Sequence, residues 1–124
     1  MGTANDDVER SGRITSRAAA RPYLTQYEQG GVWVVAAYGA FDLNSVPLLV
    51  GALQEATVTH ATVVVDAAGF TFADSTVLSA LLAFRRCHDL RLARPAHNFQ
   101  RVLELTGADQ VLDIRPTVND AITP

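Results

Sequence analysis

Three adjacent polar residues, Asp74, Ser75 and Thr76, are the side chains in this sequence best placed to do chemistry. Ser75 brings a hydroxyl next to a carboxylate, where an apolar strand pattern gives way to an apolar helix pattern. The first backbone N–H groups of a helix have no partners within the helix, and the helix dipole is positive at that end. A serine there tolerates a phosphate group. The sequence therefore indicates a phosphorylation site on a binding surface.

A hydrolytic role for Ser75 has no support in the sequence. A serine nucleophile needs a histidine base that an acid orients, or the Gly-x-Ser-x-Gly turn of the α/β-hydrolases. The three histidines, His60, His88 and His97, stand in no such motif, and the turn is absent. We therefore predict that the protein is not an enzyme and that it has no catalytic residues.

The sequence also predicts no metal site and no cofactor. Its only cysteine, Cys87, excludes a cysteine-based metal cluster, and His88-Asp89 is more typical of a solvated helix end. The phosphate-binding loops Gly-x-x-x-x-Gly-Lys and Gly-x-Gly-x-x-Gly are absent as well. Sensing of a nucleotide or another small molecule stays open as an alternative function.

Composition limits the class of partner. Hydrophobic residues make up 48% of the 124 residues, which is enough for one domain with a buried core. The net charge is −3, and an acidic balance argues against a nucleic-acid ligand. No apolar run reaches the ~18 residues that span a membrane, and the N-terminus lacks the apolar core of a signal peptide. We expect a cytoplasmic monomer without membrane contacts.

The apolar patterns predict an α/β fold. Strands are expected at residues 23–28, 32–38, 61–65, 90–93 and 111–114. Helices are expected at about 45–56, 75–86 and 97–105, with a short final helix from 117. Gly30-Gly31 marks an opening hairpin, and short continuous apolar runs suit parallel strands. The predicted fold is a mixed four- to five-stranded sheet, parallel in its later part and covered by about four helices.

The ends of the chain and the loops add further predictions. Residues 1–22 are polar and without periodicity, which predicts a flexible N-terminal tail ahead of a domain at 23–124. Residues 39–43 are expected to form a loop. Either Asn44 or Ser45 is expected to cap the helix that follows.

Several segments together resemble the STAS domain family. They occur in the family's order, and they are Gly39-Ala40-Phe41-Asp42-Leu43 with Pro47, Val65-Asp66, Phe72-Ala73-Asp74-Ser75-Thr76 and Leu103-Glu104-Leu105-Thr106-Gly107. Over about residues 23–123 the chain resembles, more narrowly, the stand-alone anti-sigma factor antagonists of bacteria.

The resemblance implies a regulatory mechanism. Such an antagonist binds an anti-sigma factor, a histidine-kinase-like ATPase that acts as a serine kinase, and thereby frees a sigma factor. Phosphorylation of one serine ends the binding, and a serine phosphatase restores it. Matched by position, Ser75 is the phosphoacceptor. The partner-binding residues that we predict are Asp42, Asn44, Asp74, Ser75, Thr76 and Val77.

Two residues beside Ser75 leave alternatives open. Thr76 is a second candidate acceptor. Val77 stands where the family commonly has glycine, and we place it near the surface, where its bulk would hinder the approach of a kinase. A constitutive STAS docking or scaffold module, with its switch weakened by Val77, is therefore an alternative to the phosphorylation switch.

Overall fold

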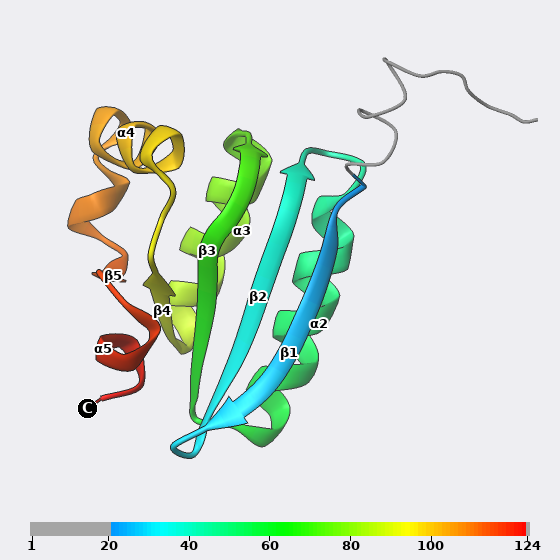
Figure 1. The fold of residues 1–124 in the computed structure, drawn as a ribbon, viewed down its shortest axis with the longest axis vertical. Helices are drawn as coiled ribbons and strands as arrows, with labels where there is room; N and C mark the ends of the chain where they lie inside the picture. The colour runs from blue at the N-terminus through cyan, green and yellow to red at the C-terminus, as the bar shows by residue number, and fades with distance from the viewer. Residues whose placement is uncertain (1–20, 124) are drawn as a thin grey trace, which may run out of the picture.

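One five-stranded mixed sheet runs through the computed structural model, which describes residues 21–123 (Figure 1). The strands lie in chain order, β1 (Tyr23–Gln29), β2 (Val32–Phe41), β3 (Thr62–Ala73), β4 (Asp89–Ala93) and β5 (Asp113–Arg115). β1 and β2 are antiparallel, and each later pair is parallel. This confirms the predicted fold class. The predicted tail at 1–22 lies outside the described residues except for Arg21 and Pro22.

Three α-helices and one 3₁₀ turn connect the strands within the described range, and a fourth α-helix follows the last strand. They are α2 (Val46–Thr59), α3 (Ser75–Cys87), α4 (His97–Thr106), the turn η1 (Ala108–Gln110) and α5 (Val118–Ile122). In Figure 1, α2 and α3 lie behind the sheet. Because α2 follows β2 and α3 follows β3, both helices begin at the edge where those two parallel strands end. None of the helices in the described part is long and apolar enough to cross a membrane.

Alternation along the buried strands divides the core into two clusters. Val63 and Val65 pack with Leu53 of α2, Leu81 of α3 and Leu103 of α4 in the larger cluster. Val64, which lies between these two valines, packs on the other face of the sheet. There it forms a small cluster with Val34 and with Ala121 of α5. A strand covered on both faces is mostly apolar on both, which explains the continuous valine run.

Two strands are longer than the sequence predicted. β2 continues through Gly39 to Phe41, where a loop was expected, and β3 continues to Ala73. The pairing register of the two strands shifts along this extension, and Gly39 has φ 101°, a conformation that side chains other than glycine rarely adopt. The extension pairs Ala40 with Phe72 and therefore carries the two strands together as far as the candidate site.

The final helix was predicted correctly, whereas the last strand lies later in the chain than predicted. The turn η1 ends at Gln110, and β5 covers Asp113–Arg115 instead of 111–114. Thr117 begins the last helix, and its hydroxyl accepts a 3.0 Å hydrogen bond from the backbone N–H of Asp120.

Candidate functional site

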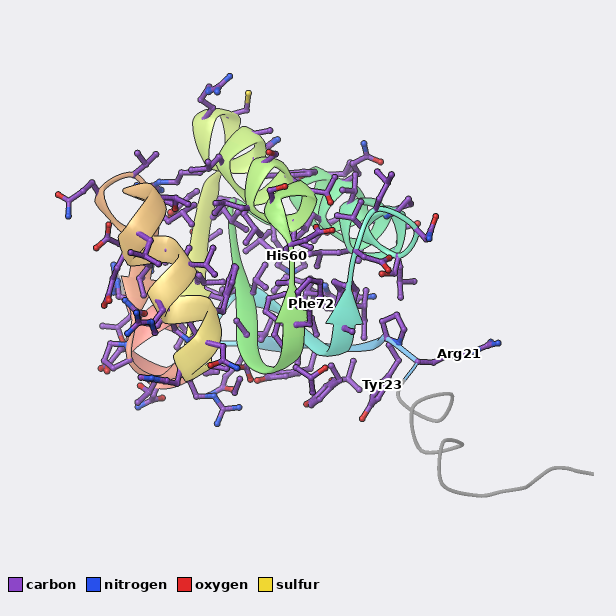
Figure 2. All side chains as sticks on the ribbon, turned by 90° about the horizontal axis from the view of Figure 1, so that it is seen from above. Arg21, Tyr23, His60 and Phe72 are labelled. Atoms are coloured by element: carbon purple, nitrogen blue, oxygen red, sulfur yellow. The ribbon has the colours of Figure 1, made fainter. Side chains whose placement is uncertain are left out.

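The loops after β2 and β3 meet at one edge of the sheet, which Figure 2 shows from above. The backbone N–H of Asp74 donates a 3.4 Å hydrogen bond to the carbonyl oxygen of Phe41, so the two chain segments are directly joined. We call residues 42–45 and 74–76 the Ser75 edge. It contains five of the six predicted partner-binding residues. Two of them come from the loop after β2 and three from the start of α3, about 30 positions later, and the two groups meet only because β2 and β3 are neighbours.

Asp74 caps helix α3. Its Oδ1 atom accepts hydrogen bonds from the backbone N–H groups of Thr76, at 2.9 Å, and of Val77, at 3.4 Å. The Thr76 hydroxyl bond is the largest influence on the Asp74 pKa. Together with the two backbone bonds it holds that pKa below its ordinary value, against an opposing effect of desolvation. The carboxylate is therefore ionised at neutral pH and occupies the first free N–H groups of the helix.

The two candidate phosphoacceptors differ in accessibility. The Thr76 hydroxyl donates a hydrogen bond to Asp74 Oδ1, and the Thr76 side chain is half-buried. Ser75, the first residue of α3, is exposed, and its hydroxyl has no hydrogen-bond partner among residues 21–123. A kinase can meet the Ser75 hydroxyl directly, whereas Thr76 must first leave its carboxylate partner.

Asp42 organises the other loop of the Ser75 edge. Its Oδ1 atom accepts hydrogen bonds from the backbone N–H groups of Asn44, at 3.0 Å, and Ser45, at 3.1 Å, and from the Ser45 hydroxyl, at 3.1 Å. Asp42 is exposed, and it therefore has a structural role in addition to any contact with a partner. The Asn44 side chain is exposed and takes no part in this network among the described residues.

The prediction that Asn44 or Ser45 caps α2 was correct for the position of Ser45 but not for a side-chain bond to the helix. Ser45 is the N-cap residue by position, but its side chain makes no capping bond. A cap normally binds the second or third N–H of the helix. Pro47, the second helical residue, has no N–H, and the N–H of Leu48 donates to the Ser45 carbonyl at 3.0 Å. The Ser45 hydroxyl is left to bond with Asp42.

The prediction that Val77 lies near the surface was also wrong. Its side chain is 0% exposed and belongs to the larger core cluster. α3 lies on the sheet, and this turns its third residue inward while Ser75 stays at the surface. Val77 is therefore not a contact residue for a partner, and its bulk does not stand in the way of a kinase.

Exposed apolar side chains lie within and next to the Ser75 edge, and the sequence did not identify them as site residues. Leu43 is 68% exposed in the β2–α2 loop, Leu48 is 47% exposed in the first turn of α2, and Phe72 is 55% exposed at the end of β3. Figure 2 labels Phe72 at this edge. The sequence indicated such a surface only through Phe72, an aromatic residue shortly before Asp74 and Ser75. Its exposure depends on how far β3 extends.

The part of the chain that the structure describes contains no candidate metal site. No group of three or more His, Cys, Asp or Glu side chains there could hold an ion. The acidic residues of the Ser75 edge instead bond to backbone N–H groups and hydroxyls of their own loops.

Comparison with known proteins identifies relatives of the same fold. Residues 24–116 match a family model described as "Mlab, STAS domain". The solved structure of an anti-sigma factor antagonist from Mycobacterium paratuberculosis is 23% identical, with a TM-score of 0.76 over 83% of this chain and 92% of that chain. No curated protein matches the sequence significantly.

Two structures of one further protein show the same fold. The anti-sigma factor antagonist SpoIIAA in its unphosphorylated form is 14% identical, with a TM-score of 0.65 over 79% of this chain and 92% of that chain. The Bacillus cell fate determinant SpoIIAA in its phosphorylated form is 14% identical, with a TM-score of 0.60 over 79% of this chain and 96% of that chain.

Proposed function

The chain belongs to the STAS domain family, and on this premise we propose that it is an anti-sigma factor antagonist. It binds an anti-sigma factor, a histidine-kinase-like ATPase that acts as a serine kinase, and so frees a sigma factor. Phosphorylation of Ser75 ends this binding, and a serine phosphatase restores it. The protein acts as a monomer in the cytoplasm. The similar solved structures include two anti-sigma factor antagonists, and one of these, SpoIIAA, was also solved in a phosphorylated form, which supports the proposal.

The observation that carries the proposal is the position of the Ser75 hydroxyl. It is exposed at the first position of a 13-residue helix, beside a neighbouring hydroxyl that is held by Asp74. A kinase must place the acceptor oxygen in line with the phosphate that it transfers. Ser75 can be reached in this way without unfolding the helix.

The surroundings of Ser75 support a protein partner. Leu43, in the loop after β2, and Phe72, at the end of β3, expose apolar surface at the Ser75 edge, and large exposed apolar side chains at one edge are typical of interaction sites. Asp42 and Asn44 add polar groups at the same edge. This mixture of apolar and polar side chains fits a non-obligate interface that forms and dissociates.

Phosphorylation at Ser75 disfavours the complex on electrostatic grounds. A phosphate carries nearly two negative charges. The backbone N–H groups of Thr76 and Val77, which could otherwise bind it, already bond to the ionised Asp74. The phosphate is therefore next to a carboxylate and keeps its water shell, which a docked partner must remove. We expect an affinity roughly a hundredfold lower, about 2.7 kcal/mol.

Phosphate transfer tests the proposal. The full chain is incubated with ATP and each purified anti-sigma factor of the histidine-kinase-like class from the same genome, and the intact mass is measured. We expect one added phosphate on the wild-type chain and on Thr76→Ala, and none on Ser75→Ala. A phosphate that persists on Ser75→Ala, or no phosphate with a kinase that binds the chain, contradicts the assignment of Ser75.

A further inference from the structure

A narrow apolar groove lies beside the Ser75 edge, between the end of β3 and the first turns of α4. It encloses about 230 Å³. Six of the residues that line it are Phe70, Phe72, Ala73, Asn98, Phe99 and Val102. Asn98 and Phe72 are exposed, so the groove opens to the surface.

The floor of the groove is rigid. Phe70 and Phe99 are 5% and 3% exposed and meet edge to face, with ring centroids 5.3 Å apart. Phe70 meets Phe41 in the same way at 5.4 Å. Such contacts fix the rings in place. The groove is therefore formed before any partner arrives, and its occupant does not have to order the floor.

Size and chemistry limit what the groove can take. Pockets for small molecules usually enclose about 300–1,000 Å³ and contain several polar groups that fix the ligand's orientation. This groove is smaller, and its floor is made of phenyl rings. A single side chain such as leucine, methionine or phenylalanine fits both properties. Pockets that receive one anchoring side chain are typical of the energetically dominant positions in protein interfaces.

The groove is continuous with the Ser75 edge. Only Ala73 and Asp74 separate Phe72 from Ser75 along the chain, so the two Cα atoms lie within about 11 Å of each other. A protein that covers Ser75 therefore reaches the groove as well. A partner that places one apolar side chain there also covers the exposed ring of Phe72.

We infer that this groove receives one apolar side chain of the anti-sigma factor that binds the Ser75 edge. The inference rests on the proposed function and adds a second point of contact to it. The groove supplies apolar affinity that does not depend on charge, whereas Ser75 supplies the change of charge. The two contacts then affect binding separately, so a groove variant weakens the complex without changing how phosphorylation acts on it.

Two groove variants test the inference, with affinity for the purified anti-sigma factor measured by calorimetry. Phe72→Ala removes the exposed wall, and Asn98→Trp covers the opening with a bulky ring from an exposed helix position. Each is expected to weaken binding about tenfold to hundredfold, as for the loss of one buried apolar side chain. The control is Val58→Ala, because Val58 is 84% exposed near the far end of α2. It should bind like the wild type. Thermal melting verifies that all variants are folded.

Each outcome decides something. If folded groove variants bind within about twofold of the wild type, the inferred role of the groove in binding is wrong. The proposed function is then still supported, provided that Ser75→Asp weakens binding. A wild-type chain that binds no anti-sigma factor overturns both. A free chain that sediments as a dimer, and becomes a monomer in Phe72→Ala, overturns the inference in favour of a second copy as the occupant.

Discussion

Two clusters of polar side chains, the Ser75 edge and a pair formed by Asp66 and Arg94, differ in what their charges contact. At the Ser75 edge, Asp42 and Asp74 bond to backbone N–H groups and hydroxyls of their own loops, and no arginine pairs with them among the described residues. On the face that carries α5, Asp66 is only 5% exposed and binds Arg94 through both carboxylate oxygens, at 3.1 and 2.7 Å. The first cluster is open to a partner, and the second is closed by its own ion pair.

The closed cluster extends to neighbouring tyrosines. Burial raises the pKa of Tyr27, and the negative charge of Asp66 raises it further. The rings of Tyr23 and Tyr38 stack with centroids 4.8 Å apart, and Figure 2 shows Tyr23 on the side of the sheet away from α2 and α3. Asp66 lies in the motif Val65-Asp66 that contributes to the family resemblance. Asp66 therefore stabilises the fold through Arg94, whereas the motif residues of the Ser75 edge are the ones that we propose to bind the partner.

The largest effect that we expect comes from breaking the closed cluster. Arg94→Ala leaves the buried Asp66 carboxylate without its partner, and the free energy of unfolding should fall by about 3 kcal/mol. This is the lower end of the range for buried pairs, because the Arg94 side chain is 49% exposed and water can replace it in part. Urea unfolding measures the loss. Affinity for the anti-sigma factor should stay within about twofold wherever the variant is folded.

A glycine variant separates charge from backbone strain at the same position. Arg94 has φ 50°, which costs free energy in any residue except glycine. Arg94→Gly loses the ion pair but relieves this strain, so it should be more stable than Arg94→Ala. Equal or lower stability of the glycine variant would show that the positive φ of residue 94 costs little free energy.

The next largest effect concerns binding and leaves stability unchanged. Ser75→Asp places a second carboxylate beside Asp74 and should lower the affinity for the anti-sigma factor roughly a hundredfold, whereas Ser75→Ala should bind like the wild type. Calorimetry with the purified anti-sigma factor measures both. Because Ser75 is exposed, both variants should melt close to the wild type. Equal affinities of the two variants exclude a switch at this position.

The sequence predicted the elements better than it predicted their ends and orientations. Runs of apolar, β-branched and aromatic residues located the strands, and Gly30-Gly31 located the hairpin. The continuation of β2 through Gly39 was missed, because a glycine with positive φ is typical of a turn and only the pairing with β3 keeps it in a strand. Val77 was misplaced, because the direction of a helical side chain depends on how the helix lies on the sheet, which no local pattern records.

A smaller effect on stability should follow from removing the cap of α3. Asp74→Ala frees the N–H groups of Thr76 and Val77 and the Thr76 hydroxyl, and N-cap substitutions of this kind destabilise helices. We expect a melting temperature lower by a few degrees, a smaller loss than in Arg94→Ala. Calorimetric melting measures it. If Asp74→Ala also makes Thr76 a phosphoacceptor, the hydrogen bond to Asp74 is what excludes Thr76 in the wild type.

The smallest expected effect is the pH dependence of that cap. The Asp74 pKa is lowered in the folded chain, above all by the Thr76 hydroxyl bond. Its ionisation therefore stabilises the fold above the ordinary aspartate pKa, and this contribution is lost as the pH falls through the lowered value. Asp74→Asn keeps a capping oxygen but does not titrate. The wild type should exceed Asp74→Asn in urea midpoint at neutral pH, and the difference should shrink as the pH falls below the ordinary aspartate pKa. Because Asp89 and Asp113 also have lowered pKa values and are present in both chains, the comparison cancels their titration. Equal urea midpoints of the two chains at neutral pH would mean that the oxygen of residue 74, rather than its charge, holds the end of α3 that carries Ser75.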